Sequence, residues 1–389
     1  MKIAYLVNTL PIHPTVTDQI RSLVGRGHEI SIISIFPPTQ PREEIEPILT
    51  QHLVVAAHVR VARTFLLGLA TAPGLLFHLI RRGRPYIGIK GSVRAFYLVK
   101  IIQKREIARI HCEFVSINSL YALVLSRELH IPASHTIHGS DLLLKPLEHL
   151  REIIAEARPF ITISEYNRTY IEKRYGPGLP SIEVVRCGVN PDRFTPDTDR
   201  RNTAPLRIVT VSWFRPVKSL DTLVRSLVIL EDRNVPFHAV IIGGGTDGKD
   251  TVRSIIDEGG ISRKTEMTGA LSRDGVKKHL ARSDIFALPS ISEGVPVSMM
   301  EAMAMELPVV ATDIMGISEI VIEGVTGFMV PQQEPAALAD RLELLIHDKR
   351  LRISMGREGR KVIIERYNTQ KNVARLESLF LDTGGPNRD

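Results

Sequence analysis

The chain has 389 residues, of which 43% are hydrophobic and 24% charged, so it is too apolar to stay disordered and long enough for two domains. Its two cysteines, Cys112 and Cys187, exclude a disulfide framework and a cysteine-rich metal site. The opening residues Met1–Val7 have the pattern of a buried strand and lack the long apolar region of a secretory signal. We therefore expect a globular protein of the reducing cytoplasm.

Strand and helix patterns alternate through the first half of the chain. Short runs of β-favouring residues at Lys2–Val7 and Glu29–Ile35 flank a helical pattern at Gln19–Arg26. Further strands are predicted at Ile110–Val115, Ala133–Ile137, Phe160–Ile163 and Ile182–Val185. Strands that alternate with helices indicate an α/β fold, in which helices cover both faces of a parallel sheet.

A strongly basic segment lies between residues 58 and 110. The chain has a formal net charge of +7, and this segment sets one acidic residue, Glu106, against eleven basic ones: Arg60, Arg63, Arg81, Arg82, Arg84, Lys90, Arg94, Lys100, Lys104, Arg105 and Arg109. Its apolar run Phe65–Ile80 is broken by Pro73 and is too short to cross a bilayer.

Two interpretations of this basic segment are open. It is either a core helix followed by a solvated basic helix, or residues 60–109 lie on an anionic membrane surface. In the second case the protein would be peripheral on the inner face of the membrane. No aromatic platform accompanies the charge, so we expect no nucleic-acid partner.

The alternation of strands and helices stops at residues 191–205, where three prolines stand among polar residues. This composition predicts a linker between an N-terminal domain of residues 1–190 and a C-terminal domain of residues 206–366. Strands of the second domain are expected at Leu206–Val211, Phe237–Ile242, Lys264–Met267, Ile285–Leu288, Val309–Ala311 and Gly327–Val330.

The tail from Pro335 to Leu381 has helical spacing throughout, and residues 367–389 are expected to pack back on the first domain. Two doubly wound, Rossmann-like domains joined by a linker predict a central cleft between the carboxyl ends of their sheets. Ligands of such sheets bind at that edge, so functional side chains are expected there.

Two glutamates of the second domain, Glu293 and Glu301, are candidates for ligand binding. Their spacing of eight residues is not informative, because two other glutamate pairs in the chain share it. Their context is informative, because they follow the buried strand Ile285–Leu288. Gly294 permits close approach of a ligand to the backbone, and Pro296 suits the first turn of a helix.

The start of that helix offers exposed N–H groups and the positive end of a dipole, which together suit a diphosphate. The residues around this start are Gly294, Val295, Pro296, Val297 and Ser298. Glu293 would then accept from a sugar hydroxyl and Glu301 from a ribose hydroxyl, since ionised carboxylates are strong acceptors. The alternative is that Glu293 only caps the helix and Glu301 is solvated.

Six segments of the chain carry a resemblance to a known family: Gly188–Phe194, Val211–Leu223, Ile241–Gly245, Ser292–Ala304, Leu307–Thr312 and Gly324–Phe328. In this order they resemble the motifs of family-4 retaining glycosyltransferases, which have the GT-B fold. The first domain is similar, through Pro11–Ser34, to members that build bacterial surface polysaccharides of the exopolysaccharide and colanic-acid type.

The resemblance implies a donor site that needs no metal and no cofactor. In the family, an Arg and a Lys neutralise the diphosphate of the donor, a UDP-, GDP- or ADP-sugar. Lys218 matches that Lys, while Trp213 occupies the position of the Arg. Arg215, with its long bidentate side chain, would take its place. Gly244 either admits the nucleotide close to the backbone or is an ordinary turn residue.

In the first domain, His138 follows a predicted strand, and the resemblance implies a histidine there near the reacting sugar carbon. A lone histidine is more often structural, but the carboxyl end of a strand is where ligands bind. Asp141 would orient His138 or contact the acceptor. Thr17, in the first loop Pro11–Thr17, would shape the acceptor side.

We therefore expect a hexosyltransferase that retains the anomeric configuration and moves a sugar to a glycan or lipid-linked acceptor in cell-surface polysaccharide synthesis. Lys218 and Arg215 would stabilise the leaving diphosphate. One alternative is a nucleotide-sugar epimerase or hydrolase of the same fold, and another is a non-catalytic scaffold on a membrane surface. A dehydrogenase is disfavoured, because no glycine fingerprint follows Lys2–Val7.

Overall fold

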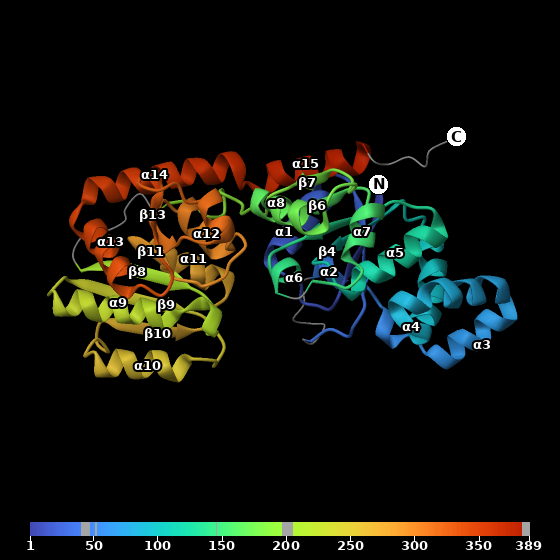
Figure 1. Cartoon of the computed structure of the whole chain (residues 1–389), viewed down its shortest axis with the longest axis horizontal. Helices are drawn as coiled ribbons and strands as arrows, with labels where there is room; N and C mark the ends of the chain where they lie inside the picture. Colours follow the sequence, from blue (N-terminus) through green and yellow to red (C-terminus); the bar gives the residue numbers. More distant parts are fainter. Residues whose placement is uncertain (40–46, 51–52, 145, 197–204, 383–389) are drawn as a thin grey trace. The chain divides into compact units, whose positions relative to one another are not determined.

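The computed structural model describes residues 1–39, 47–50, 53–144, 146–196 and 205–382 (Figure 1). The chain divides into two compact units: unit 1 comprises Met1–Arg186 and Thr369–Asp389, and unit 2 comprises Cys187–Asn368. Each unit has a parallel sheet covered by helices, so the predicted α/β class is confirmed. The cleft expected between two domains stays a prediction.

The boundary between the units differs slightly from the predicted one at residue 190. Val189 and Phe194 are fully buried in a core of unit 2, and the Val189 N–H donates to the carbonyl oxygen of Tyr367 over 2.9 Å. These contacts place residues 187–190 in unit 2, although their sequence position assigned them to the first domain. The predicted linker therefore starts inside unit 2, and its residues 197–204 lie outside the described part of the chain.

Unit 1 contains a seven-stranded parallel sheet in the order β3-β2-β1-β4-β5-β6-β7. Its strands are β1 (Lys2–Val7), β2 (Glu29–Ser34), β3 (Val54–Val55), β4 (Arg109–Glu113), β5 (Ala133–Ile137), β6 (Phe160–Thr162) and β7 (Ile182–Val184). Along β1, Ile3 and Tyr5 point to one face and Ala4 and Leu6 to the other, because successive strand residues alternate. All four are buried, so helices cover both faces.

The helices of unit 1 are α1 (Pro14–Gly25), α2 (Pro47–Thr50), η2 (Ala56–His58), α3 (Val61–Thr71), α4 (Pro73–Lys104), α5 (Ile117–Leu129), α6 (Ser140–Leu143), α7 (Leu150–Glu156), α8 (Glu165–Tyr175) and α15 (Thr369–Asp382). Helix α15 packs against α1, and its Phe380 shares a core with Tyr5 (Figure 1). The C-terminal end of the chain thus completes unit 1.

Unit 2 contains a six-stranded parallel sheet in the order β10-β9-β8-β11-β12-β13. Its strands are β8 (Leu206–Val211), β9 (Phe237–Ile242), β10 (Thr265–Gly269), β11 (Ile285–Leu288), β12 (Val309–Thr312) and β13 (Gly327–Val330). Its helices are η3 (Pro216–Lys218), α9 (Leu220–Asp232), α10 (Lys249–Glu258), α11 (Arg273–Ala281), α12 (Val297–Ala304), η4 (Met315–Glu319), α13 (Pro335–His347) and α14 (Lys349–Arg366). Ile208 and Val209 enter different cores, so this sheet is also buried on both faces.

Three local differences from the predicted elements have plain causes. Strand β3 was not predicted, because two residues are too short to give a pattern. Helix α1 begins at Pro14, ahead of the predicted start, since proline suits a first helical turn and His13 caps the helix. The apolar run Phe65–Ile80 falls on two helices, because Pro73 starts α4 after α3 has ended. No helix in the described part of the chain is long and apolar enough to span a membrane.

Candidate functional site

The carboxyl ends of β8 and β11 bring Lys218 and Glu293 together in unit 2. These strands are neighbours in the parallel sheet, so the loops that follow them share one edge. The Lys218 Nζ lies 2.5 Å from Glu293 Oε1, and the Ser290 hydroxyl donates to the same oxygen over 2.8 Å. The Ile291 N–H donates to the Val217 carbonyl, which ties the two loops to each other.

The geometry of this ion pair suits a site for an anion. The side chains of Lys218 and Glu293 are 22% and 10% exposed, so both are partly shielded but can be reached. In the pair, the carboxylate neutralises the ammonium group. An arriving polyanion would compete for Lys218 and leave Glu293 able to accept from another donor.

The predicted helix after Glu293 is α12, and it begins one residue later than expected. Pro296 occupies the N-cap position, so the helix starts at Val297. The first N–H groups of a helix have no acceptor within it, and Val297 and Ser298 are only half buried. The carbonyl oxygen of Gly294 lies against Gly316, where a Cβ would come within 2.6 Å. The loop is therefore held closely while the helix start stays accessible.

Glu301, on the second turn of α12, is not solvated. Its exposed fraction is 7%, and the Arg273 Nε donates to its Oε1 over 3.2 Å. Arg273 begins α11 and also lies over the ring of Phe194. An arginine partner for Glu301 was not predicted, because the two residues come from different elements of the sequence.

Trp213, at the position where the resembled family has an arginine, presents an exposed indole. Trp213 is 57% exposed, and Arg215 is exposed as the N-cap of η3. The glycines after β9 pack against this loop: a Cβ on Gly243 would lie 1.7 Å from the Ser212 oxygen. A Cβ on Gly244 would lie 2.9 Å from Cζ3 of Trp213. Contact between the two loops therefore explains why glycines stand here.

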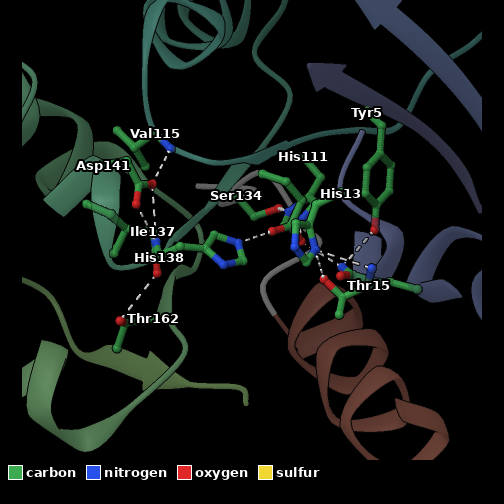
Figure 2. A network of polar contacts seen from close by, with 12 residues as sticks. Tyr5, His13, Thr15, His111, Val115, Ser134, Ile137, His138, Asp141 and Thr162 are labelled. Atoms are coloured by element: carbon green, nitrogen blue, oxygen red, sulfur yellow. Dashed lines mark hydrogen bonds and ion pairs between the residues drawn. The ribbon is translucent and has the colours of Figure 1, made fainter. Parts of the chain in front are cut away.

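In unit 1, His138 lies at the end of β5 within a buried polar network (Figure 2). Its Nε2 is 2.8 Å from Glu113 Oε2, and its ring stacks on Phe114 with 3.9 Å between ring centroids. Phe114 has a φ of 60°, which is uncommon for a residue with a side chain. These contacts hold the imidazole of His138 in one orientation.

Glu113 is the centre of this network. It is 4% exposed and also accepts from Gln19 Nε2 over 2.8 Å and from His111 Nε2 over 3.0 Å. Burial by itself raises the pKa of Glu113, but hydrogen bonds from His111 and His138 outweigh burial and lower the pKa to about 2. An ionised carboxylate only accepts, so we assign a proton to Nε2 of both histidines.

Asp141 lies beside His138, as one of the two predicted roles requires, whereas Thr17 lies on a helix and not in the predicted loop. Asp141 accepts from the peptide N–H groups of His138 and Val115, at 2.9 Å and 2.8 Å, so it anchors the backbone around His138 (Figure 2). Burial raises the pKa of Asp141, against these hydrogen bonds. Thr17 lies within α1 and is 4% exposed, so it is not a loop residue. From the loop before α1, His13 also lies near Phe114, with 6.1 Å between the ring centroids.

Comparison with known proteins identifies the chain. The family model described as Glycosyltransferase Family 4 matches residues 14–193, and the model described as Glycosyl transferases group 1 matches residues 194–362. The two matches follow one another and include both clusters of polar residues described above. The chain belongs to glycosyltransferase family 4.

Relatives of this glycosyltransferase have related names. The amylovoran biosynthesis glycosyltransferase AmsK of Erwinia amylovora is 26% identical over 374 residues, which cover 87% of this chain and 89% of AmsK. A GDP-mannose-dependent alpha-(1-6)-phosphatidylinositol monomannoside mannosyltransferase of Mycolicibacterium smegmatis is 30% identical over 246 residues, covering 59% of this chain and 64% of that protein. The predicted class of enzyme, a glycosyltransferase, is thus confirmed.

A solved structure shows the same fold. HepE of Anabaena, crystallised with UDP and glucose, superposes with a TM-score of 0.75 at 16% identity and covers 98% of this chain and 100% of its own. The likeness confirms the predicted GT-B fold of the glycosyltransferase.

Glu113, His111, Gln19 and Arg273 are site residues that sequence reasoning missed. Glu113 and His111 stand two apart at the end of a predicted strand, so they share one face of the sheet. Two polar residues on one face at the end of this strand, which neighbours the strand before His138, could have indicated the site. No local pattern connects Arg273 to Glu301, because packing of α11 beside α12 alone makes them neighbours.

Proposed function

We propose that this glycosyltransferase moves a sugar from a nucleoside-diphosphate sugar to a glycan or lipid-linked acceptor and retains the anomeric configuration. The observation that carries the proposal is the Lys218–Glu293 pair beside the start of α12, at the carboxyl edge of the unit 2 sheet. A cation, a hydroxyl-accepting carboxylate and free helical N–H groups together match the diphosphate and sugar of such a donor.

In this proposal, charge stabilisation of the leaving group is the main source of catalysis. As the bond between the anomeric carbon and the diphosphate breaks, negative charge grows on the phosphate oxygens. Lys218, the exposed Arg215 and the first N–H groups of α12 would stabilise that charge without a bound metal. The acceptor hydroxyl attacks the same face of the sugar, and its proton passes to the departing phosphate.

The two glutamates of unit 2 would position the donor and form no covalent intermediate. Glu293 would accept from a sugar hydroxyl once Lys218 turns to the diphosphate. Glu301 would accept from a ribose hydroxyl, because the two oxygens of a carboxylate offer about four acceptor positions. Gly244 and residues 294–298 would line the site that holds the nucleotide.

The His138 network would serve the reacting sugar. Glu113 fixes the proton on Nε2 of His138, so the other ring nitrogen is the acceptor and would take a hydrogen bond from a sugar hydroxyl. Asp141 supports this arrangement through the backbone. The acceptor side would lie near His13, where the first loop of unit 1 meets Phe114.

The names of similar proteins suggest which nucleotide bases and acceptors to test. HepE was crystallised with UDP and glucose, and the mycobacterial relative is named for GDP-mannose and a phosphatidylinositol monomannoside. AmsK is named for biosynthesis of the polysaccharide amylovoran. We accordingly propose a role in cell-surface polysaccharide or glycolipid synthesis at the cytoplasmic face of the membrane. A thermal-shift screen of UDP-, GDP- and ADP-sugars would find the donor, since a bound ligand stabilises the folded state.

The test of the proposal is the variant Glu293→Gln, assayed with the donor found in that screen. We expect transfer to fall at least a hundredfold while the fold is kept. Glu258→Gln is the matched control, because Glu258 is an exposed glutamate with the same spacing to a second glutamate. Full transfer by Glu293→Gln would contradict the proposal. Release of free sugar as the only product would favour a hydrolase, and inversion in the product's NMR spectrum would exclude retention.

A further inference from the structure

A groove of about 830 Å³ runs along the outer edge of the unit 1 sheet, far in the strand order from His138. Its lining includes Val54 and Val55 of the edge strand β3. Residues from the start of α3 and from the C-terminal end of α4 also line it. Neither the His138 network nor the predicted donor residues line this groove, so the glycosyl-transfer chemistry leaves it unexplained.

The lining of the groove combines cationic and apolar side chains that recur at helical spacing. Arg60, Arg63 and Leu67 stand three and four residues apart around the first turns of α3 and face the groove from one side. Tyr97 of α4 and Arg105, the C-cap residue of that helix, also line the groove and stand eight residues apart, about two helical turns. His58 adds a fourth basic side chain, and the described lining contains no acidic one.

Two of these cations are exposed and have no counter-ion in the described part of the chain. Arg60 and Arg63 make no ion pair or hydrogen bond there through their side chains, although Arg60 supplies the N-cap backbone of α3. Arg105 donates to the Ser31 hydroxyl over 3.2 Å, which directs its guanidinium inward. A groove of this charge is complementary to an anion, and its apolar lining offers contact surface to a hydrocarbon part of the same ligand.

The outer surface beside the groove is unusually apolar. Helix α3 lies at the periphery of unit 1 and is held to α4 by the close contact of Gly68 with Leu76 (Figure 1). Its Leu66 and Leu67 are 66% and 54% exposed, and Phe77 at the start of α4 is 55% exposed. Apolar residues gathered on one exposed hairpin, next to arginines that have no partner among the described residues, are typical of elements that lie in a lipid interface.

We propose that this groove binds the phosphoryl head group of a membrane lipid, with Arg60 and Arg63 on the phosphate and the lipid chain along Leu67 and Tyr97. The exposed Leu66 and Phe77 would enter the lipid surface beside it. A free phosphate would leave the apolar lining without a role. The lipid-linked acceptor of the proposed function, on which this extension rests, belongs to the class of lipids that the groove would take.

The position of the groove restricts that acceptor. His58 and Arg60 follow the carboxyl end of β3, while His138 follows that of β5, four strand positions away in the same sheet. At the usual strand spacing this is roughly 19 Å. A lipid phosphate held in the groove would therefore have to carry several sugars for its end to reach the side of His138, which favours a lipid-linked oligosaccharide.

The first test measures binding of the full chain to vesicles by co-sedimentation. We expect binding to phosphatidylglycerol vesicles and little to phosphatidylcholine vesicles. The double variant Arg60→Gln/Arg63→Gln should bind about thirtyfold more weakly, since each cation near an anionic surface adds about 1 kcal/mol. Arg81→Gln/Arg82→Gln, on exposed positions of α4 outside the groove, is the matched comparison and should lose clearly less. Equal losses would overturn the groove and leave only diffuse surface attraction.

The second test separates the lipid from free phosphate. A soluble short-chain phosphatidylglycerol should raise the melting temperature of the wild-type chain, and Arg60→Gln/Arg63→Gln should abolish that rise while its circular dichroism stays native. An equal rise with inorganic phosphate alone, or no rise with either, would overturn the proposal. Calorimetry of donor binding to the wild-type chain reports on the proposed function independently, so failure of one can be told from failure of the other.

Discussion

The two candidate sites differ in how their charged groups are held. In unit 2, Lys218 and Glu293 form one ion pair that is partly exposed and comes from two loops. In unit 1, Glu113 is buried and satisfied by His111, His138 and Gln19. The Lys218–Glu293 ion pair can be separated by a competing polyanion, which suits a site that must bind and release a diphosphate. Glu113, with three hydrogen-bond donors, suits a site in which the imidazole of His138 must keep one orientation.

The largest effect is expected for Lys218→Ala in unit 2. If Lys218 stabilises the leaving diphosphate, kcat should fall by about a hundredfold to a thousandfold, the cost of losing one preorganised charge-stabilising group. Steady-state transfer with saturating donor is the measurement. Lys278→Ala, on an exposed position of α11, is the control. A variant that loses only affinity for the donor, with kcat unchanged, would show that Lys218 binds ground state and transition state equally.

For unit 1, the informative change is Glu113→Gln, which keeps the shape but leaves donors of the network without an acceptor. The pKa of Glu113 is lowered from its ordinary 4.5 to about 2, so its ionised form stabilises the fold at neutral pH by about 3 kcal/mol. That contribution is present above pH 4.5 and is lost as the pH falls through about 2.

Urea unfolding of wild type and Glu113→Gln between neutral pH and acid checks this prediction. The difference in the free energy of unfolding should shrink towards low pH, and kcat at neutral pH should fall about tenfold to a hundredfold. Glu172→Gln, at an exposed position of α8, is the control for loss of a carboxylate. A difference in stability that does not change with pH would show that the carboxylate is not ionised in the folded state.

A smaller effect is expected for Arg215→Ala, which asks whether Arg215 replaces the arginine that Trp213 displaces. A charge-assisted contact at an exposed position should be worth about a tenfold change in donor Kd. Calorimetry with the donor measures it, and Arg225→Ala, exposed on α9, is the control. Unchanged affinity would remove Arg215 from the phosphate site and leave Lys218 with α12 alone.

The smallest effect is expected for Gly244→Ala. Its Cβ would meet the Trp213 indole at 2.9 Å, but that indole is exposed and can turn aside, so the melting temperature should drop by only a few degrees. Gly243→Ala is the contrast, because its Cβ would overlap the Ser212 backbone, and it should be destabilised by about 3 kcal/mol. Equal destabilisation would show that the Trp213 loop is rigid.

Some of this arrangement could be predicted from local patterns. Glu293 and Lys218 follow strands whose apolar runs are plain in the sequence, and parallel neighbours end at one edge. The same rule directed attention to His138, and the resemblance to the family supplied the role predicted for it. Glu113 was not predicted, because two of its three donors, Gln19 of α1 and His138 after β5, are distant from it in the chain. Thr17 was misplaced because the start of α1 depends on His13 and Pro14, which a search for apolar spacing passes over.

Residue type and spacing are enough to predict the alternation of strands and helices, the division into two α/β units, the order of the family motifs and the concentration of charge between residues 58 and 110. These features depend on interactions over a few positions. Three other features appear only in the folded chain: Glu301 pairs with Arg273, Asp141 binds backbone N–H groups, and Arg60 and Arg63 line a groove beside an edge strand. Those contacts join segments far apart in the chain, so they depend on how buried surfaces pack and not on any local pattern.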